Sequence, residues 1–191
     1  MMLAGRTILI TGAARGLGRE IARTCAAQGA RLVLADIDPA VQAVAEELGA
    51  RAATVDLGEP DSITALADGI AAQEGTLHAL VNNGAVATNV GGMGFEEIEL
   101  DLWDRVQRVN VRGTWLMTRA AAGMLRASGS GRVVNVASDT ALWGAPRLLA
   151  YTASKGAVMA MTRSLARELG PDRVGVTCVA PGILTTESTD Y

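Results

Sequence analysis

The sequence predicts an α/β fold in three layers, with one doubly wound, mainly parallel sheet. Short apolar runs with the length and β-branching of buried strands alternate with longer segments rich in Ala, Leu and Arg that are typical of helices. Regular alternation of this kind indicates a parallel sheet covered by helices on both faces. Glycines and polar residues gather where the strands should end, which is where such sheets bind ligands.

The first half of the chain alternates between strand and helix from its start. A β-branched run opens it, a glycine-rich turn follows, and Gly29 ends the first helix. The predicted elements of this half lie, in chain order, at 7–11, 19–28, 31–35, 39–48, 51–55, 59–73 and 78–81.

The second half has longer helices. A glycine-rich loop at 88–94 leads to a helix at 100–127, which Asn110 and Gly113 are expected to interrupt. No repeat, low-complexity tract or linker divides the 191 residues, so we expect a single domain at 1–191. The remaining predicted elements are a strand at 132–137, a helix at 150–170 and a sixth strand at 173–179.

The composition argues against several classes of protein. The formal net charge is −3 and the arginines are scattered, so neither nucleic acid nor a membrane is an expected partner. No segment reaches the ~20 apolar residues of a membrane span. Cys25 and Cys178 lack metal-ligand spacing, and we expect reduced core thiols in a cytoplasmic protein without a metal site. The single histidine, His78, has no accompanying motif and is expected to be structural.

The turn after the first strand has the context of a dinucleotide-binding loop. It reads Thr-Gly-Ala-Ala-Arg-Gly-Leu-Gly at 11–18, between a strand and a helix. Glycines let the backbone approach a pyrophosphate, and the helix N-terminus offers free N–H groups and a positive dipole end. The candidate cofactor contacts in this turn are Gly12, Arg15, Gly16, Leu17 and Gly18.

Asp36 ends the second strand, about twenty residues after the glycines. A carboxylate there can accept hydrogen bonds from both ribose hydroxyls of NAD and would repel the 2′-phosphate of NADP. Arg15 favours NADP instead, since its guanidinium could pair with that phosphate. No basic residue follows Asp36 directly, so we expect NAD, with NADP as the less favoured cofactor.

Tyr151 and Lys155 are candidates for proton transfer. They stand four residues apart in a predicted helix and so share one face, and Lys155 is the only lysine of the chain. An ammonium about 4 Å from a phenol would lower the phenol's pKa by about three units, into the range of a general base at neutral pH. Ser138, on the loop before this helix, could hold a substrate oxygen. The alternative is a surface Tyr and Lys at helical spacing with a serine nearby.

Taken together, these residues resemble the short-chain dehydrogenase/reductase family in its common type. The resemblance runs through almost the whole chain in the family's order and spacing. Its motifs are the glycine turn at 11–18, Asp36, Asp56, Asn-Asn-Gly-Ala at 82–85, Asn110, Ser138, Tyr151-x-x-x-Lys155 and Pro181-Gly182.

The resemblance implies a Rossmann fold that binds NAD(P) and a catalytic tetrad of Asn110, Ser138, Tyr151 and Lys155. Tyr151 would be the general acid/base and Ser138 would polarise the substrate oxygen. Lys155 would lower the phenol's pKa and hold the nicotinamide ribose, while Asn110 would hold the long helix open for a relay water. Further cofactor contacts would be Asp56, Leu57, Asn83, Gly84, Ala85, Pro181, Gly182, Ile183 and Thr186.

Two features depart from the family's pattern. The order Gly84-Ala85 reverses the family's Ala-Gly, so any positive φ needed at Ala85 would cost about 1 kcal/mol or more. The sequence also stops at Tyr191, without the family's last helix and seventh strand, which would leave the strand at 173–179 at the edge of the sheet. For the 191-residue chain we therefore expect weak NAD binding and little turnover.

The sequence thus predicts an oxidoreductase that transfers a hydride between NAD(H) and a secondary alcohol or ketone. One alternative is a truncated dinucleotide-binding module without turnover. Another is an NADPH-dependent ketoreductase, such as a 3-oxoacyl-thioester reductase. A methyltransferase shares the glycine turn but gives no reason for Ser138, Tyr151 and Lys155 to occur together.

The substrate is less well specified. Met93, Leu142, Trp143 and Leu148 are predicted on loops beside the tetrad and indicate an apolar substrate pocket. The alternative is that these four side chains pack the core beneath the loops.

Small residues recur along the helices at 100–127 and 150–170 and would allow close packing against a second copy. The resemblance implies a homodimer through this pair of helices, and for a full-length protein it also allows a tetramer. The small residues are Gly113, Ala120, Ala153, Gly156, Ala157 and Ala160.

Overall fold

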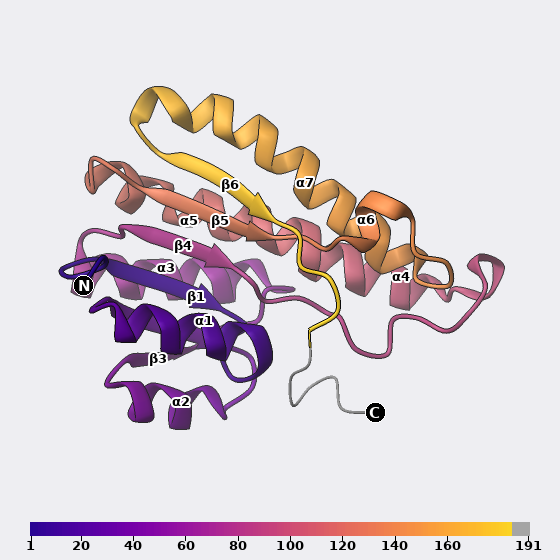
Figure 1. Cartoon of the computed structure of the whole chain (residues 1–191), viewed down its shortest axis with the longest axis horizontal. Helices are drawn as coiled ribbons and strands as arrows, with labels where there is room; N and C mark the ends of the chain where they lie inside the picture. The colour runs from indigo at the N-terminus through magenta and orange to yellow at the C-terminus, as the bar shows by residue number, and fades with distance from the viewer. Residues whose placement is uncertain (185–191) are drawn as a thin grey trace.

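The computed structural model describes residues 1–184 and contains one sheet of six parallel strands (Figure 1). All six predicted strands are confirmed, with small shifts at their ends. Along the sheet the order is β3-β2-β1-β4-β5-β6. In chain order the strands are β1 (Thr7–Thr11), β2 (Arg31–Asp36), β3 (Arg51–Thr54), β4 (Ala79–Asn82), β5 (Arg132–Val136) and β6 (Gly175–Val179).

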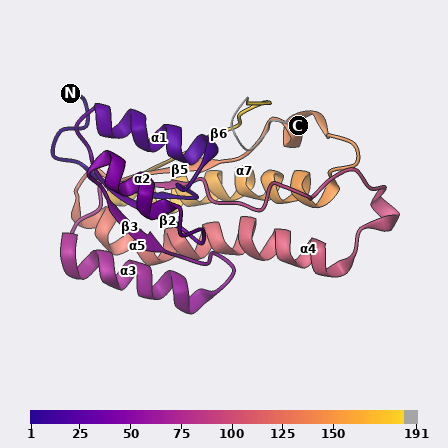
Figure 2. The ribbon, with the colours of Figure 1, turned by 90° about the horizontal axis from the view of Figure 1, so that it is seen from below.

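Helices cover both faces of the sheet, which confirms the three-layer, doubly wound fold (Figure 2). Two helices pack on one face, α1 (Gly16–Ala27) and α2 (Val41–Leu48). Three pack on the other, α3 (Pro60–Glu74), α5 (Thr114–Ala127) and α7 (Leu149–Leu169).

The central strand β1 shows how the sequence separates the two faces. Ile8 and Ile10 pack with α1 and α2, whereas Leu9, between them, packs with the helices of the opposite face. Successive side chains of a strand point to opposite faces, so a fully apolar strand contributes to both cores.

The strand order reverses between β1 and β4. In sheets of this kind the connections from the two strands at such a reversal go to opposite faces, which opens a crevice at their carboxyl ends. The segment after β6 runs past these ends (Figure 1). Among the described residues β6 forms one edge of the sheet, as the sequence analysis expected.

The predicted helix at 100–127 is divided into three parts. A π-helical segment, η2 (Arg108–Gly113), separates α4 (Leu100–Gln107) from α5. Asn110 and Gly113 both lie in η2, so the predicted interruption is confirmed. A Cβ on Gly113 would lie 2.6 Å from the carbonyl oxygen of Leu57, which means that only glycine allows this close approach.

Three short helices lie where the sequence analysis predicted loops or the end of a helix. They are η1 (Phe95–Glu97), α6 (Thr140–Trp143) and η3 (Gly170–Asp172). α1 also begins earlier than predicted, at Gly16, inside the glycine turn. Its N-terminus therefore belongs to the turn itself.

A buried hydrogen-bond network joins β4 and β5 near their carboxyl ends. Asn82 and Asn135 are paired in the parallel register, and Asn82 Nδ2 donates to Asn135 Oδ1 at 2.8 Å. Asn82 Nδ2 also donates to Thr118 of α5, and Asn135 Nδ2 donates to Thr162 of α7. Buried polar groups are costly when unpaired, so this network fixes how the two helices sit on the two strands.

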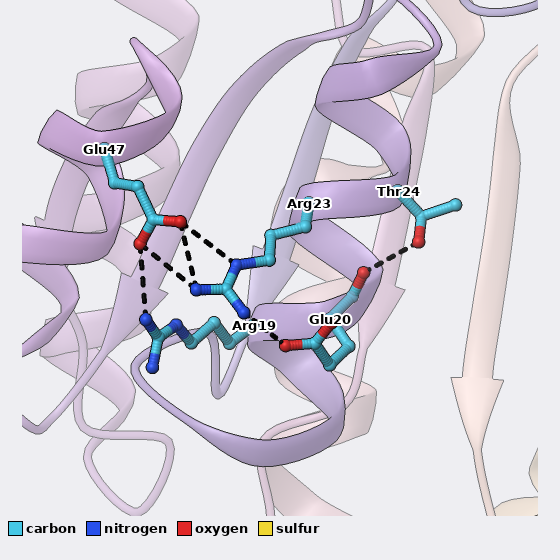
Figure 3. Close-up of polar contacts among 5 residues, drawn as sticks. All are labelled: Arg19, Glu20, Arg23, Thr24 and Glu47. Atoms are coloured by element: carbon cyan, nitrogen blue, oxygen red, sulfur yellow. Dashed lines mark hydrogen bonds and ion pairs between the residues drawn. The ribbon is translucent and has the colours of Figure 1, made fainter.

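The helices α1 and α2 are linked at the surface by an ion-pair network (Figure 3). Arg23 binds Glu47 through Nε and Nη2 at 3.1 and 3.0 Å, and its Nη1 binds Glu20 at 2.7 Å. Arg19 reaches the other oxygen of Glu47 at 3.3 Å. The two arginines are partly exposed and the two glutamates exposed, so solvent screens these pairs and each contributes little to stability.

His78 and the two cysteines have structural surroundings. His78 Nδ1 accepts the backbone N–H of Thr7 at 3.0 Å, between β4 and β1. Cys25 and Cys178 are free and only partly buried. Among residues 1–184, no helix is long and apolar enough to cross a membrane, and no cluster of side chains could hold a metal ion.

Candidate active site

A cavity of about 870 Å³ opens at the carboxyl ends of the strands. It is bounded by the glycine turn, the loops after β2, β3, β4 and β5, the start of α7 and the segment after β6. Ser138 and all the predicted cofactor positions among the described residues line it, whereas Thr186 lies outside those residues. These positions are Gly12, Arg15, Gly16, Leu17, Gly18, Asp36, Asp56, Leu57, Asn83, Gly84, Ala85, Tyr151, Lys155, Pro181, Gly182 and Ile183.

The glycine turn is locked to the end of β4. Gly12 has a φ of +66°, and a Cβ there would lie 2.6 Å from the Cα of Gly84. Asn83 Nδ2 donates to the carbonyl oxygens of Thr11 and Gly12, both at 3.0 Å. A side chain at position 12 would force these two loops apart, so glycine is required for the shape of the cavity floor.

Asp36 is held rigidly at the end of β2. Its Oδ2 accepts the backbone N–H of Ala14 at 2.9 Å, and its Oδ1 accepts that of Asp38 at 3.0 Å. Arg15 lies opposite, with its guanidinium 3.8 Å from Asp38 and 67% of its side chain exposed. The carboxylate therefore has a fixed place on the cavity wall, and a second carboxylate partly balances the arginine.

The reversed order Gly84-Ala85 causes no backbone strain in this structure. Ala85 does not have a positive φ, so the expected conformational cost does not arise. A Cβ at Gly84 would lie 2.7 Å from Leu57 Cδ1 and 3.2 Å from Gly12 N. Leu57 occupies the space beside Gly84, so a side chain at position 84 would require Leu57 to shift.

Asp56 holds the loop between β3 and α3. Its Oδ1 accepts the N–H of Gly58 at 2.7 Å, and its own N–H donates to Ser62 at 2.9 Å. These two bonds place Asp56 and Leu57 on the cavity wall.

Ser138, Tyr151 and Lys155 meet on one side of the cavity. Ser138, just after β5, is 7% exposed, and Lys155, within α7, is 4% exposed. Both residues are therefore buried. Lys155 Nζ lies 5.5 Å from the centre of the Tyr151 ring and donates to the carbonyl oxygen of Val136 at 2.8 Å. The predicted proximity of the three side chains is confirmed.

The pKa of Tyr151 is shifted in the opposite direction from the expectation. Burial raises the pKa of Tyr151, a side-chain hydrogen bond with Ser138 acts to lower that pKa, and the negative charge of Asp139 raises it further. Burial also lowers the pKa of Lys155 to about 8. The prediction that Lys155 brings the pKa of Tyr151 down is not met by the protein alone, because burial penalises the phenolate and the ammonium is turned toward Val136.

Asn110 lies behind the cavity wall and is 1% exposed. Its Oδ1 accepts the N–H of Val86 at 2.8 Å, while Nδ2 donates to the Val86 carbonyl at 3.1 Å and to Ser154 Oγ at 3.1 Å. Its side chain thus ties the loop after β4 to α7, one turn from Tyr151. This arrangement makes Asn110 a positioning residue, and it does not line the cavity.

The four predicted substrate-pocket residues do not line this cavity. Leu142 and Trp143 lie on α6, not on a loop, with 71% and 62% of their surface exposed. Leu148 packs on a small core beneath the loop at 88–94, where a Cβ on Gly91 would lie 2.7 Å from it. Leu148 shares this small core with Tyr151, and the contact of Met93, Leu142, Trp143 and Leu148 with substrate stays a prediction.

Several residues that line the cavity were not among the predicted site positions, including three with long side chains. Ile37 follows Asp36, and Arg105 and Arg108 come from α4 and η2. A signal for the arginines was available, since Arg105, Arg108 and Val109 stand at helical spacing just before Asn110.

Comparison with known proteins gives a consistent result. The family model described as short chain dehydrogenase matches residues 6–191. The chain belongs to this family. This short-chain dehydrogenase is an oxidoreductase, which confirms the predicted family and reaction class.

Its relatives include enzymes with different substrates. The 3-alpha-(or 20-beta)-hydroxysteroid dehydrogenase of Mycobacterium tuberculosis H37Rv is 38% identical over 192 residues, covering 99% of this chain and 73% of that protein. The D-threitol dehydrogenase of Mycolicibacterium smegmatis is 35% identical, covering 97% of this chain and 72% of that one. A crystal structure of the 3-ketoacyl-(acyl-carrier-protein) reductase of Brucella melitensis complexed with NADH is 34% identical, with a TM-score of 0.92, over 96% of this chain and 78% of that one.

Proposed function

We propose that this short-chain dehydrogenase transfers a hydride between NAD(H) and a small secondary alcohol or ketone. The observation that carries the proposal is that one cavity holds Ser138, Tyr151 and Lys155 on one wall and the fixed carboxylate of Asp36 on another. The first group can move a proton at a substrate oxygen. The second can bind the ribose of a dinucleotide that has no 2′-phosphate.

The cavity fits a dinucleotide in its shape and its polar groups. The N-cap residue of α1, Arg15, makes no side-chain capping bond, and the first turn of α1 has no acidic residue, so the positive end of this helix lines the cavity without an acidic side chain of its own. We expect this end to bind the pyrophosphate. Asp36 would bind the adenosine ribose, and Lys155 the nicotinamide ribose.

The residues of the tetrad divide the work of proton transfer. When bound, the nicotinamide accepts or donates the hydride. In alcohol oxidation Tyr151 takes the hydroxyl proton as the carbonyl forms, and in ketone reduction it returns that proton. Ser138 donates a hydrogen bond to the substrate oxygen, which stabilises the charge that develops there. Asn110 holds α7 and the loop after β4 in fixed positions relative to each other.

Cofactor choice is the first test. NAD should bind at least about tenfold more tightly than NADP, a difference in binding free energy of about 1.4 kcal/mol. Asp36→Asn should bring the two dissociation constants closer, because the repulsion of the 2′-phosphate is removed. Isothermal titration with both cofactors measures this. Equal constants for the wild-type protein would contradict the choice of NAD.

An NADPH-dependent ketoreductase is the alternative favoured by one observation, the presence of Arg15 on the cavity wall. In that case Asp38→Asn, which releases Arg15 from its ion pair, should strengthen NADP binding and leave NAD binding unchanged. A dinucleotide-binding module without turnover would bind NAD and oxidise none of a panel of secondary alcohols.

We also propose a cytoplasmic homodimer. The free thiols of Cys25 and Cys178 suit a reducing compartment. A shallow depression of about 490 Å³ on the outer side of the long helices suits a second copy. Val111, Trp115 and Met161 form its apolar part, and Gln107, Arg108 and Arg112 complete its lining. One of the small residues expected at the dimer interface does not belong there. Gly113 faces Leu57 of its own chain and cannot pack against a partner.

Trp115→Arg should convert the dimer to a monomer, because it removes a large apolar side chain from the depression and adds a positive charge beside Arg108 and Arg112, and burying like charges together is costly. Trp115 is 44% exposed. Trp143→Arg is the matched control, since Trp143 is more exposed and lies on α6, outside the depression. Sedimentation velocity at micromolar concentration measures both variants. A monomeric wild-type protein would contradict the interface.

A further inference from the structure

Asp139 directly follows Ser138 and lies against the segment that follows β6. Its backbone N–H donates to the Pro181 carbonyl at 3.0 Å. Its Oδ2 lies 3.2 Å from the place that a Cβ on Gly182 would occupy. Pro181 and Gly182 both line the cavity, so the carboxylate stands immediately beside the cavity wall that also carries Ser138 and Tyr151.

The carboxylate of Asp139 has no compensating partner within residues 1–184. It caps no backbone N–H at the start of α6, and it takes part in none of the hydrogen bonds or ion pairs of that part of the chain. The active-site cation Lys155 donates to the Val136 carbonyl instead. A fixed negative charge is therefore left beside the active site.

The charge of Asp139 also reaches the reacting group, since it contributes to the raised pKa of Tyr151. The other charged or titratable groups around Tyr151 are few. Lys155 lies one turn along α7, and Cys178 on β6 faces Lys155. α4 packs with Tyr151 through apolar side chains and contributes the cation Arg105 to the same cavity. Asp139 is thus the negative group of this wall.

We propose that Asp139 is a specificity-determining residue that makes the site prefer the oxidised cofactor, NAD⁺, over the reduced cofactor, NADH. The inference rests on the proposed function, which brings the nicotinamide next to Tyr151. The oxidised nicotinamide ring is positively charged and the reduced ring is neutral. A nearby carboxylate therefore stabilises only the oxidised form.

This preference would favour the chain's use as a dehydrogenase over its use as a reductase. Asp139 leaves the overall equilibrium of the reaction unchanged, because a catalyst does not alter the free energies of the free substrates and products. It does weaken the binding of NADH relative to NAD⁺. NADH, the cofactor product of alcohol oxidation, is then released more readily and inhibits the enzyme less.

The test compares the dissociation constants of NAD⁺ and NADH, measured by isothermal titration, in the wild type and in Asp139→Asn. We expect the ratio of the NADH dissociation constant to the NAD⁺ dissociation constant to fall by about tenfold in the variant. A charge within about 4 to 6 Å of a second charged group is worth about one pKa unit or more, which corresponds to about tenfold in affinity. Asp172→Asn is the matched control, with the same change of charge at the opposite end of β6, and its ratio should equal that of the wild type.

A second readout is the pH profile of kcat/KM for alcohol oxidation. Loss of the negative charge lowers the pKa of Tyr151, so the profile of Asp139→Asn should move to lower pH. Asp139→Ser removes the same charge with a smaller side chain and carries the test if the Asn variant does not fold. A ratio unchanged within about twofold in the folded variants would overturn the inference. Failure of the wild type to bind either form would instead overturn the proposed function.

Discussion

Tyr151→Phe is expected to lower kcat by about 10³-fold, because general acid–base catalysis contributes about 10² to 10⁴ to rate and no other described side chain on this wall can replace the phenol. Ser138 has a pKa far too high to act as the base, and the Lys155 ammonium donates to the Val136 carbonyl. The measurement is steady-state alcohol oxidation at saturating NAD.

The same variant should bind NAD as tightly as the wild type does. The phenol acts on the substrate oxygen, whereas the pyrophosphate and adenosine sites lie at the glycine turn and at Asp36. Unchanged NAD affinity thus separates a lost catalytic group from a damaged fold. More than about a tenth of wild-type activity in the Phe variant would refute the role of Tyr151.

The largest expected effect on stability comes from Gly18→Ala. A Cβ at this position would lie 2.0 Å from the carbonyl oxygen of Gly12 and 2.5 Å from Asn83 Nδ2. Backbone atoms cannot move aside as a flexible side chain can. The glycine turn must therefore separate from the end of β4, at a cost of about 3 kcal/mol in the free energy of unfolding, together with loss of NAD binding.

Gly123→Ala is the matched control for this substitution. Gly123 lies within α5, and a Cβ there meets no atom within 4 Å. The change should stabilise the protein by about 0.5 to 1 kcal/mol, because alanine favours the helix. Urea unfolding of both variants measures these changes in the free energy of unfolding. If Gly18→Ala unfolds at the same urea concentration as the wild type, the close approach of the two loops is not needed.

Much of the fold could be predicted because its signals are local. The β-branched run of β1, the glycine turn and the helix after it follow one another within about twenty residues, and each is specified by its own residue types. The pairing of Tyr151 with Lys155 is equally local, because helical spacing alone puts both on one face. The interruption at η2 was also visible, as a polar residue and a glycine in a long helix.

Tertiary structure decided the features that depend on segments far apart in the chain. The partners of Asn110 are Val86 and Ser154, and the neighbour of Gly113 is Leu57. Sequence periodicity does not reveal such contacts. Gly113, which was expected at a dimer interface, therefore proved to contact Leu57 of its own chain.

The electrostatics of the site show the same division. The sequence by itself determined that a phenol, an ammonium and a hydroxyl meet at the carboxyl end of a parallel sheet. It did not determine that burial raises the pKa of Tyr151, that Lys155 donates to Val136, or that Asp139 stands beside Gly182. A side chain's charge state depends on the solvent excluded from it and on the groups that surround it, and both exist only once β5, β6 and α7 have packed together.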